Sequence, residues 1–435
     1  MSGIECGEAD VEAAKAWIAS RNAAVRVSVA RRPFAALRGW RFDARSGNLV
    51  HESGRFFSVV GLDVYANAGR PSRWMQPIVD QPEVGMLGIL TREIDGVPHC
   101  LLQAKVEPGN VNGVQLSPTV QATRSNCLQV HGGRRPKYLD FFLGAKREQI
   151  VLDQLQSEQG ARFFRKRNRN MIVRISEDVA EDENFRWMSL PLVKALMRCD
   201  NVVNMDTRTV LSGWMESCRE GGGDDERPHL SMDDILFRLS ALKSRYELVV
   251  EKVGLREVDG WRIGDDEIVR PDRQFFRVVG VEASISNREV STWCQPMVEP
   301  MQEGLCVLFE KRIRGVPHYL LQAKVECGNF DVVELAPTIQ CLTGPYRTPI
   351  GYVPRFLPEF LKGELPGRIR LDVLQSEEGG RFYHEQNRNV VFEIDPDAEI
   401  PEEDGFLWLT VRQMKELLRF NNILNIQVRS LVSIL

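Results

Sequence analysis

Hydrophobic and polar positions alternate along several stretches of the chain, and this alternation predicts β-strands. In the clearest stretch, 99–107, the polar side chains fall on one face and the apolar ones on the other. The polar face holds His99, Gln103, Lys105 and Glu107. A strand face that packs on a core does not need four such residues, so this face is either half-solvated or turned toward a ligand.

The remaining elements of the first half follow from similar patterns. Apolar runs predict strands at 56–60 and 86–90, a turn at 94–97, and helices at 138–143 and 190–199. Several strands with one central and one terminal helix indicate an α+β module built on a mixed sheet. No glycine-rich phosphate loop follows a strand, which argues against a dinucleotide cofactor or an NTPase.

A long internal repeat dominates the chain. The string LQAKVE at 102–107 recurs at 321–326, and LQSE at 155–158 recurs at 374–377, each 219 residues later. The flanks repeat as well, so each copy is a whole domain. We therefore predict a first domain at 1–212, a Gly-rich charged linker at 213–230, and a duplicate at 231–435 that opens with an N-capped helix to Leu242.

Composition excludes several classes of partner. With 56 Lys and Arg against 60 Asp and Glu, the net charge is -4, and no basic field for nucleic acid is present. The nine cysteines form no Cys-x-x-Cys pair, and no apolar run approaches the ~20 residues of a membrane span. We expect a cytoplasmic protein with no metal site and no membrane association.

Other polar residues in the repeated blocks are candidates for ligand contact. Glu158 follows a strand, and Arg162 lies across the turn at Gly160; a guanidinium of this kind forks onto phosphate oxygens. His131, Arg134 and Arg135 form a loop suited to a diphosphate that has no counterpart in the second copy. For each of these, an ordinary exposed loop is the alternative, and for Trp74 and Trp293 the alternative is a buried structural role.

These strings, with their echoes, resemble the NDP-hexose 2,3-dehydratases of deoxysugar biosynthesis over nearly the whole chain. The resemblance implies a tandem duplication of a Nudix-like α/β/α sandwich domain and a homodimer with two sugar-nucleotide pockets, one of them catalytic. It implies a dTDP-4-keto-6-deoxyhexose as substrate, no cofactor, and a downstream NADPH-dependent 3-ketoreductase that acts on the product. The reaction removes the C3 proton and expels the C2 hydroxyl as water.

The carboxylate cluster of the Nudix hydrolase box is missing from both copies, and 138–143 and 355–361 occupy its place. Without clustered carboxylates, Mg²⁺ would not be held against a diphosphate. Diphosphate hydrolysis by an NDP-sugar hydrolase is therefore disfavoured. A non-catalytic sugar-nucleotide-binding protein is the other alternative.

We assign roles on residue chemistry. Lys105 stabilises the enolate, Glu107 and Glu158 are the candidate base and acid, and His99 is the reserve for either. The predicted substrate-binding residues of the first pocket are Trp74, Gln76, Gln103, Thr119, Gln121, His131, Arg134, Arg135 and Arg162. The second pocket, treated as a relic, comprises Trp293, Gln322, Lys324, Glu326, Thr338, Gln340, Glu377 and Arg381.

Overall fold

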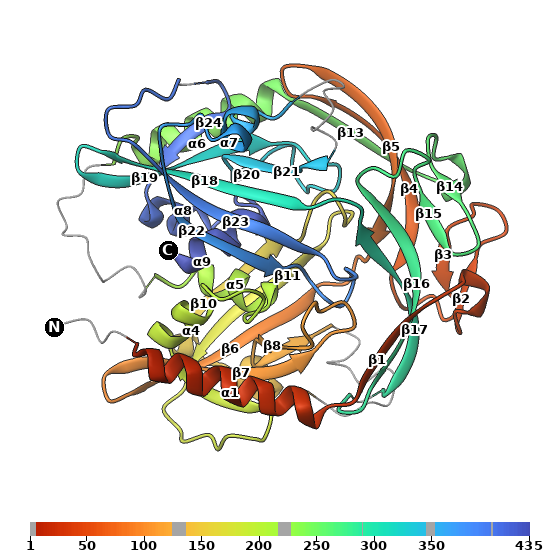
Figure 1. Cartoon of the computed structure of the whole chain (residues 1–435), viewed down its shortest axis with the longest axis horizontal. Coiled ribbons are helices and arrows are strands. Elements are labelled where there is room, and N and C mark those ends of the chain that lie inside the picture. The colour runs from red at the N-terminus through yellow and green to blue at the C-terminus, as the bar shows by residue number, and fades with distance from the viewer. Residues whose placement is uncertain (1–5, 124–135, 216–227, 289, 345–352, 402) are drawn as a thin grey trace.

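Both halves of the chain fold into the same set of elements (Figure 1). The computed structural model describes residues 6–123, 136–215, 228–288, 290–344, 353–401 and 403–435. The first copy contains α1 (Glu8–Ala24), β1 (Val27–Arg32), β2 (Trp40–Phe42), β3 (Leu49–His51), β4 (Ser58–Asn67), β5 (Pro71–Asp80), β6 (Gly85–Ile94), β7 (Val97–Val106), β8 (Val114–Ser117), β9 (Val120–Ala122), α3 (Leu139–Leu143), β10 (Ile150–Ser157), β11 (Arg167–Arg174), β12 (Phe185–Ser189), α4 (Leu190–Leu196) and α5 (Met205–Ser212). The second contains α6 (Met232–Arg245), β13 (Glu247–Val253), β14 (Arg262–Ile263), β15 (Glu267–Val269), β16 (Phe276–Ile285), β17 (Thr292–Pro300), β18 (Gly304–Ile313), β19 (Val316–Lys324), β20 (Glu334–Pro337), β21 (Ile339–Leu342), α7 (Leu357–Lys362), β22 (Gly367–Ser376), β23 (Gln386–Ile394), β24 (Phe406–Leu409), α8 (Val411–Leu417) and α9 (Ile426–Ile434).

Each copy contributes one mixed seven-stranded sheet. The first has the order β10-β11-β6-β7-β12, with β8 on β7 and β9 on β6, and the second repeats this order as β22-β23-β18-β19 with β20, β21 and β24. Within each sheet one central pair, β6 with β11 or β18 with β23, is parallel. The α+β class and the tandem duplication predicted from the sequence are confirmed.

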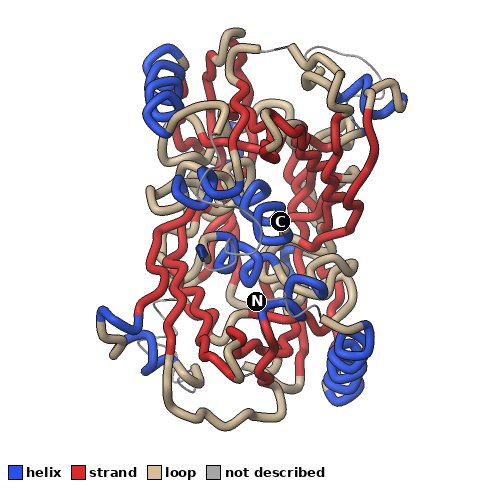
Figure 2. Tube along the Cα trace, turned by 90° about the vertical axis from the view of Figure 1, so that its left-hand side faces the viewer, coloured by secondary structure: helices blue, strands red, loops and turns tan. Residues whose placement is uncertain are grey.

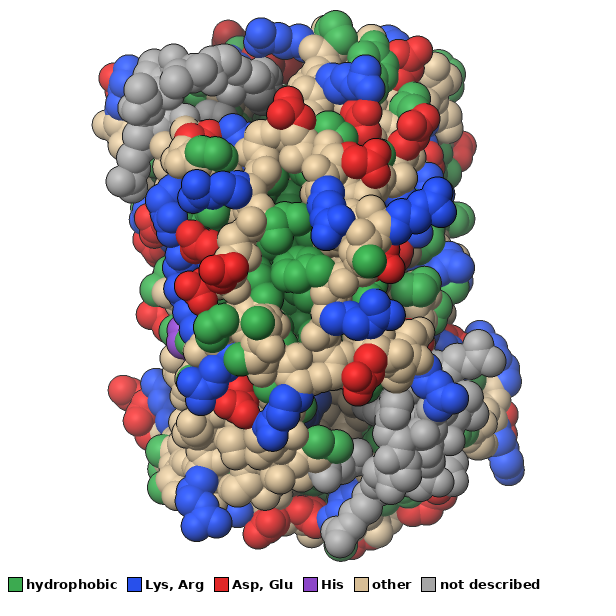
Figure 3. All heavy atoms as spheres, turned by 90° about the vertical axis from the view of Figure 1, so that its right-hand side faces the viewer, with side chains coloured by type: hydrophobic (Ala, Val, Ile, Leu, Met, Phe, Trp, Pro, Cys, Tyr) green, Lys and Arg blue, Asp and Glu red, His purple; other side chains and the backbone are tan. Residues whose placement is uncertain are grey.

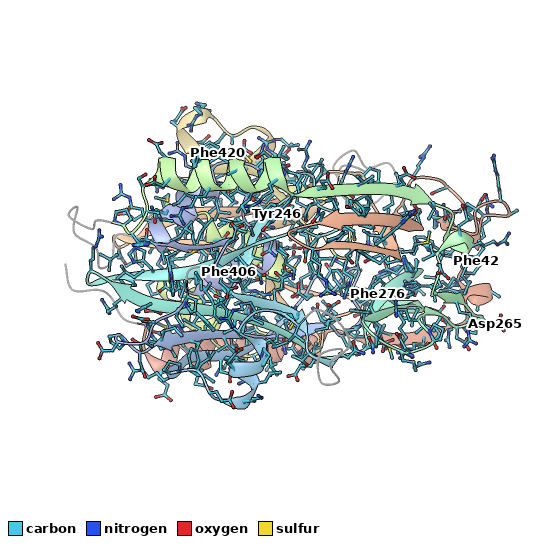
Figure 4. All side chains as sticks on the ribbon, turned by 90° about the horizontal axis from the view of Figure 1, so that it is seen from above. Phe42, Tyr246, Asp265, Phe276, Phe406 and Phe420 are labelled. Carbon is cyan, nitrogen blue, oxygen red and sulfur yellow. The ribbon has the colours of Figure 1, made fainter. Side chains whose placement is uncertain are left out.

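The two five-stranded sheets exchange strands between the copies. β1 of the first copy pairs antiparallel with β16 of the second, and β13 of the second pairs antiparallel with β4 of the first. Figure 4 shows how this happens: α6 runs through Tyr246 directly into β13, and together they form one arm that reaches across to the other copy. The copies are therefore structurally interlocked.

Short helices join the two copies at the centre of the molecule, while the long helices α1 and α6 lie at the periphery (Figure 2). α5 of the first copy packs on α9 of the second. Arg208 in α5 is 1 % exposed and donates to Ser376 O at 2.7 Å. Arg429 in α9, its counterpart, donates in the same way to Ser157 O. Each arginine thus fixes the residue that precedes a glutamate present in both copies, Glu377 for Arg208 and Glu158 for Arg429.

The outer parts of the five-stranded sheets form one face of the molecule, where hydrophobic side chains gather with Lys and Arg around them (Figure 3). The core beneath this face contains Phe163 from the first copy and Phe382 from the second, with ring centroids 5.6 Å apart. Their meeting holds together the two loops that follow β10 and β22.

Several predicted local features are confirmed. Ser231 caps α6 through Asp234 N at 3.1 Å, and the predicted turn at 94–97 has positive φ at Asp95 and Gly96. The boundaries of the linker stay a prediction, because 216–227 lie outside the described residues. Among the described helices, none combines the length and apolarity that crossing a membrane requires.

Candidate active site

Two loops, 158–166 in the first copy and 377–385 in the second, each cross into the other copy. Gly109, just after β7, donates to Gly379 O at 2.7 Å and accepts from His384 N at 2.9 Å. Gly328 makes the equivalent bonds with Gly160 O at 2.6 Å and Arg165 N at 2.9 Å. The backbones are so close that a Cβ on Gly109 would lie 1.6 Å from Phe382 O. Each polar strand end therefore lies against a loop of the opposite copy.

Lys105 and Glu107 form the centre of what we call the first site. Lys105 Nζ lies 2.6 Å from Glu107 Oε1 and donates to Gln121 Oε1 at 2.7 Å. The other carboxylate oxygen, Glu107 Oε2, accepts from Arg288 Nη2 of the second copy at 2.7 Å. Both Lys105 and Glu107 are nearly buried, at 9 % and 7 % exposure. The end of the polar strand face predicted from the sequence, Lys105 and Glu107, is therefore part of a buried ion-pair network.

Burial and charge shift the pKa values of this network in a definite way. Burial lowers the pKa of Lys105, although the Glu107 carboxylate opposes the shift. Burial alone would raise the pKa of Glu107, but Arg288 and Lys105 outweigh it and hold that pKa below its ordinary value. Glu107 is therefore a fixed carboxylate that positions Lys105, and a weak base.

A group of carboxyls lies on the other side of the first site. Glu158, at the end of β10, is 5 % exposed, and Asn168 Nδ2 donates to its Oε1. Asp206 is 2 % exposed, and Glu378 comes from the second copy. Burial and the nearby Glu378 raise the pKa of Glu158 to about 7. A carboxyl with a pKa near neutrality is suited to proton transfer.

The second site has the same plan with different partners. Lys324 Nζ donates to the backbone oxygen of Gln340 at 2.9 Å, while Gln340 Nε2 donates to Glu326 Oε1 at 3.0 Å. Nothing equivalent to Arg288 reaches Glu326 among the described residues, because the matching position of the first copy is Gly69. Burial accordingly raises the pKa of Glu326, in contrast to Glu107.

The structure redistributes several predicted residues between the two sites, which corrects our sequence assignment. Arg162, predicted for the first pocket, stacks on Phe276 of the second copy at 4.3 Å and acts on the pKa of Glu326 (Figure 4 labels Phe276). Arg381, predicted for the second, stacks on Phe57 of the first copy at 4.1 Å and acts on the pKa of Glu107. The crossing of the loops causes both changes.

The two tryptophan–glutamine pairs change places for the same reason. Trp74 packs in a cluster with Cys327, next to Glu326, and Gln76 donates to Ala161 O at 3.0 Å, so both lie beside the second site. Trp293 packs against the core of the first copy, where Arg288 lies over its ring at 5.9 Å, and Gln295 donates to Gly380 O at 2.5 Å. This pair lies beside the first site.

Three predictions concern residues whose polar groups are bound by the backbone. Thr119 and Thr338 are buried and link the central strands, Thr119 through Leu90 N at 2.9 Å and Thr338 through Phe309 N at 2.9 Å. His99 lies at the start of β7, bonded to Val97 O at 2.9 Å, about 20 Å along the strand from Lys105. We therefore remove the threonines and His99 from the site.

The remaining predicted residues lie outside the ion-pair network, in the second site, or outside the described residues. Gln103 is half-buried on β7, and Gln322 donates to Pro337 O at 2.8 Å, so neither joins the ion-pair network. Glu377, the counterpart of Glu158, is held by Asn387 in the second site. The loop with His131, Arg134 and Arg135 lies outside the described residues.

With this geometry in place, comparison with known proteins decides the family. The family model described as NDP-hexose 2,3-dehydratase matches twice, over residues 11–214 and 232–435. The chain belongs to the NDP-hexose 2,3-dehydratase family. The family model therefore matches each of the two copies of the repeat once.

Three relatives in this family share 42–46 % identity with the chain. The dTDP-4-dehydro-6-deoxy-alpha-D-glucopyranose 2,3-dehydratase of Saccharopolyspora spinosa is 46 % identical, over 96 % of this chain and 89 % of its own length. Enzymes of the same name from Streptomyces violaceoruber and Amycolatopsis orientalis are each 42 % identical, over 96 % and 99 % of this chain and 95 % and 90 % of their own lengths.

For a member of this dehydratase family, the residues that we missed in the sequence are as informative as those that we found. Asp206, Glu378 and Arg288 all contribute to the first site. At the second site their counterparts are Gln427 of the second copy, and Gln159 and Gly69 of the first copy. The signal for them in the sequence is a difference between the two copies at equivalent positions, whereas the repeat itself indicates only the identical residues.

The short helices α3 and α7 are the segments predicted from the sequence to take the position of the Nudix hydrolase box. Each contains one carboxylate, Asp140 or Glu359. Among the described residues there is also no group of three or more potential metal ligands. A helix with a single carboxylate lacks the clustered oxygen ligands that a metal-dependent diphosphatase uses.

Proposed function

We propose that this protein removes water across C2 and C3 of a dTDP-4-keto-6-deoxyhexose, and that it does so in the first site. The family and the names of the three relatives support the reaction. The observation that supports the choice of site is the replacement of two carboxyls by amides: the buried Asp206 and the half-buried Glu378 correspond to Gln427 and Gln159 in the second site. An amide does not ionise near neutral pH, so the second site has less capacity for acid–base chemistry.

Glu158 is the general base in this proposal. The C4 ketone of the substrate acidifies the C3 proton, and a carboxylate with a pKa of about 7 is ionised in a useful fraction at neutral pH while remaining basic enough to accept that proton. Glu107 is a weaker choice, because two cations engage its carboxylate at 2.6 and 2.7 Å. We therefore narrow the two sequence candidates to Glu158.

Lys105 stabilises the enolate that forms when the C3 proton leaves. Its ammonium is held by Glu107 and Gln121 at 2.6 and 2.7 Å, so it requires little reorganisation as negative charge develops on the C4 oxygen. Arg381 and Arg288 of the second copy add positive charge to the same site, and we assign to Arg381 the diphosphate contact that the sequence suggested for Arg162.

The product and partners follow from this chemistry and from the family resemblance. Loss of water leaves a C3 enol that tautomerises to a 3,4-diketo sugar, which an NADPH-dependent 3-ketoreductase would consume on the way to 2,6-dideoxy sugars of natural products. A homodimer is part of the same proposal. The hydrolase alternative is disfavoured by the single carboxylates of α3 and α7.

The test is an incubation with dTDP-4-keto-6-deoxyglucose in D₂O, without added metal or nicotinamide, followed by trapping with a 3-ketoreductase and NADPH and mass spectrometry of the nucleotide sugars. We expect a trapped 2-deoxy sugar. Unchanged and undeuterated substrate, with release of dTMP on addition of Mg²⁺, would replace the dehydratase proposal with a hydrolase.

A matched pair of variants tests the choice of site. Lys105→Met should lower kcat by about 10²–10³-fold, the usual cost of one oxyanion-stabilising donor, while Lys324→Met retains turnover. The opposite result would move catalysis to the second site. Thermal melting of both variants separates this effect from unfolding.

A further inference from the structure

Two buried carboxyls of the first site each have one oxygen that accepts no hydrogen bond within the described part of the chain. Asp206 lies in the first turn of α5, is 2 % exposed, and its Oδ1 accepts no hydrogen bond from any described residue. Glu158 Oε2 is orphaned in the same way. Buried carboxyl oxygens in native proteins nearly always have donors, so an orphaned pair beside a cationic network indicates groups that meet a ligand or hold a proton.

The backbone fixes Asp206 beside Lys105. Asn204 N donates to Leu116 O at 2.9 Å, and Thr207 Oγ1 donates to the same oxygen at 3.0 Å, so the start of α5 is tied to β8. β8 in turn pairs with β7 with Gln115 opposite Lys105. The elements around Asp206 present four charged groups to it: Lys105 and Glu107 from β7, Glu158 after β10, and Glu378 from the crossing loop.

The second site provides an internal comparison. Gln427 occupies the position of Asp206 at the start of α9, after Asn425, which caps α9 as Asn204 caps α5. The two helix starts are built alike, so packing does not demand a carboxyl at this position. An acid is therefore present only where Glu158, Glu378 and Arg288 are also present.

We propose that Asp206 is the general acid that protonates the C2 hydroxyl as it leaves, an assignment that rests on the proposed dehydratase function. Glu158 takes the C3 proton, and the electron pair of that bond forms the enolate. The enolate restores the C4 carbonyl as the C2=C3 double bond forms and the C2–O bond breaks. The departing hydroxyl takes the proton of Asp206 and leaves as water, and the proton on Glu158 then returns to Asp206.

The electrostatics fit this division of labour. Burial, with the charges of Glu158 and Glu378 adding to it, raises the pKa of Asp206 well above its ordinary value and so favours the protonated form of this carboxyl, whose Oδ1 accepts no hydrogen bond from the residues that the structure describes. Glu158, with a pKa of about 7, ionises in a useful fraction at neutral pH. One carboxyl that favours its protonated form and one that ionises near neutrality are the usual arrangement for one acid and one base.

The test separates proton removal from loss of water. Deuterium incorporation at C3 in D₂O reports the base alone, whereas the trapped 2-deoxy sugar reports complete elimination. We expect Asp206→Asn to keep C3 exchange near the wild-type rate while elimination falls by about 10²–10⁴-fold, the range for one general acid. Glu158→Gln should lose both, and the matched variant Gln427→Asn should change neither.

Two results would overturn the assignment while leaving the dehydratase function intact: wild-type elimination by Asp206→Asn, or parallel loss of exchange and elimination in a variant that still melts like wild type and binds dTDP. If wild-type protein itself neither exchanges nor eliminates, the proposed function fails instead.

A second measurement needs no variant. In the wild type, elimination should decline at alkaline pH as Asp206 loses its proton, while C3 exchange should not. Identical pH profiles for the two rates would refute the acid role of Asp206 even if Asp206→Asn did not fold.

Discussion

Replacing Glu158 by glutamine should have two effects: it should abolish turnover, and it should make the protein more stable at alkaline pH. In the unfolded chain this carboxyl has its ordinary pKa of 4.5, whereas in the folded protein burial first, and Glu378 next, raise it to about 7. Between these two values the folded state binds more protons than the unfolded state, so stability falls as pH rises. The difference of about 2.5 pKa units corresponds to about 3 kcal/mol, lost fully only above pH 7.

The assay is urea unfolding of wild type and Glu158→Gln at pH 5 and pH 8. Near pH 5 the two proteins should differ little through this effect, and at pH 8 the variant should gain up to about 3 kcal/mol relative to wild type. Glu52→Gln, at an exposed position, is the control and should show no such gain. A variant that is no more stable at pH 8 than at pH 5, relative to wild type, would refute the burial argument for Glu158.

Three further outcomes are expected. The kcat/KM for dehydration should rise tenfold per pH unit below about pH 7 and level off near pH 7 as Glu158 ionises, before the decline at alkaline pH that the acid role of Asp206 predicts; a flat profile from pH 5.5 to 8 would contradict the role of Glu158 as base. Gly109→Ala should lower the free energy of unfolding by about 1–3 kcal/mol or more, because the added Cβ would lie 1.6 Å from Phe382 O. The control Gly7→Ala, whose added Cβ has its nearest contact at 3.5 Å, should not lower it. Equal urea midpoints for the two variants would argue against the close approach of the backbones at Gly109. Arg288→Ala should lower kcat/KM on the order of tenfold, which corresponds to the loss of one charge-assisted hydrogen bond of about 1.5 kcal/mol. An unchanged kcat/KM would show that Glu107 is held well enough for catalysis by Lys105 alone.

The sequence was sufficient for the elements and for the strand face that bears Lys105 and Glu107, because periodicity and the exact repeat of LQAKVE are local properties. Residue chemistry also placed Thr119 among the substrate-binding residues, but in the structure its hydroxyl bonds the backbone of β6 and β7. A side chain's face follows from alternation, whereas its hydrogen-bond partner depends on which strand lies next to it.

What the sequence could not give is which copy completes which site. Arg162 and Arg381 have the same neighbours in the chain whether their loops pack on their own copy or on the opposite copy. The local sequence pattern therefore contains no information on which copy each loop contacts. Asp206 was overlooked for a related reason: its importance comes from burial and from the carboxyls around it, which derive from β10 and from the second copy.

The exchange of strands also constrains how this chain is made and how it has diverged. Arg32 of β1 binds Glu282 of β16 at 2.9 Å across 250 residues of chain, so the first half leaves the ribosome with open strand edges that close only when the second half follows. Such a high contact order predicts slow folding and a need for both halves in one chain. It also means that the duplicates do not drift independently, because a substitution in the loop of one copy changes the surroundings of the site in the other copy.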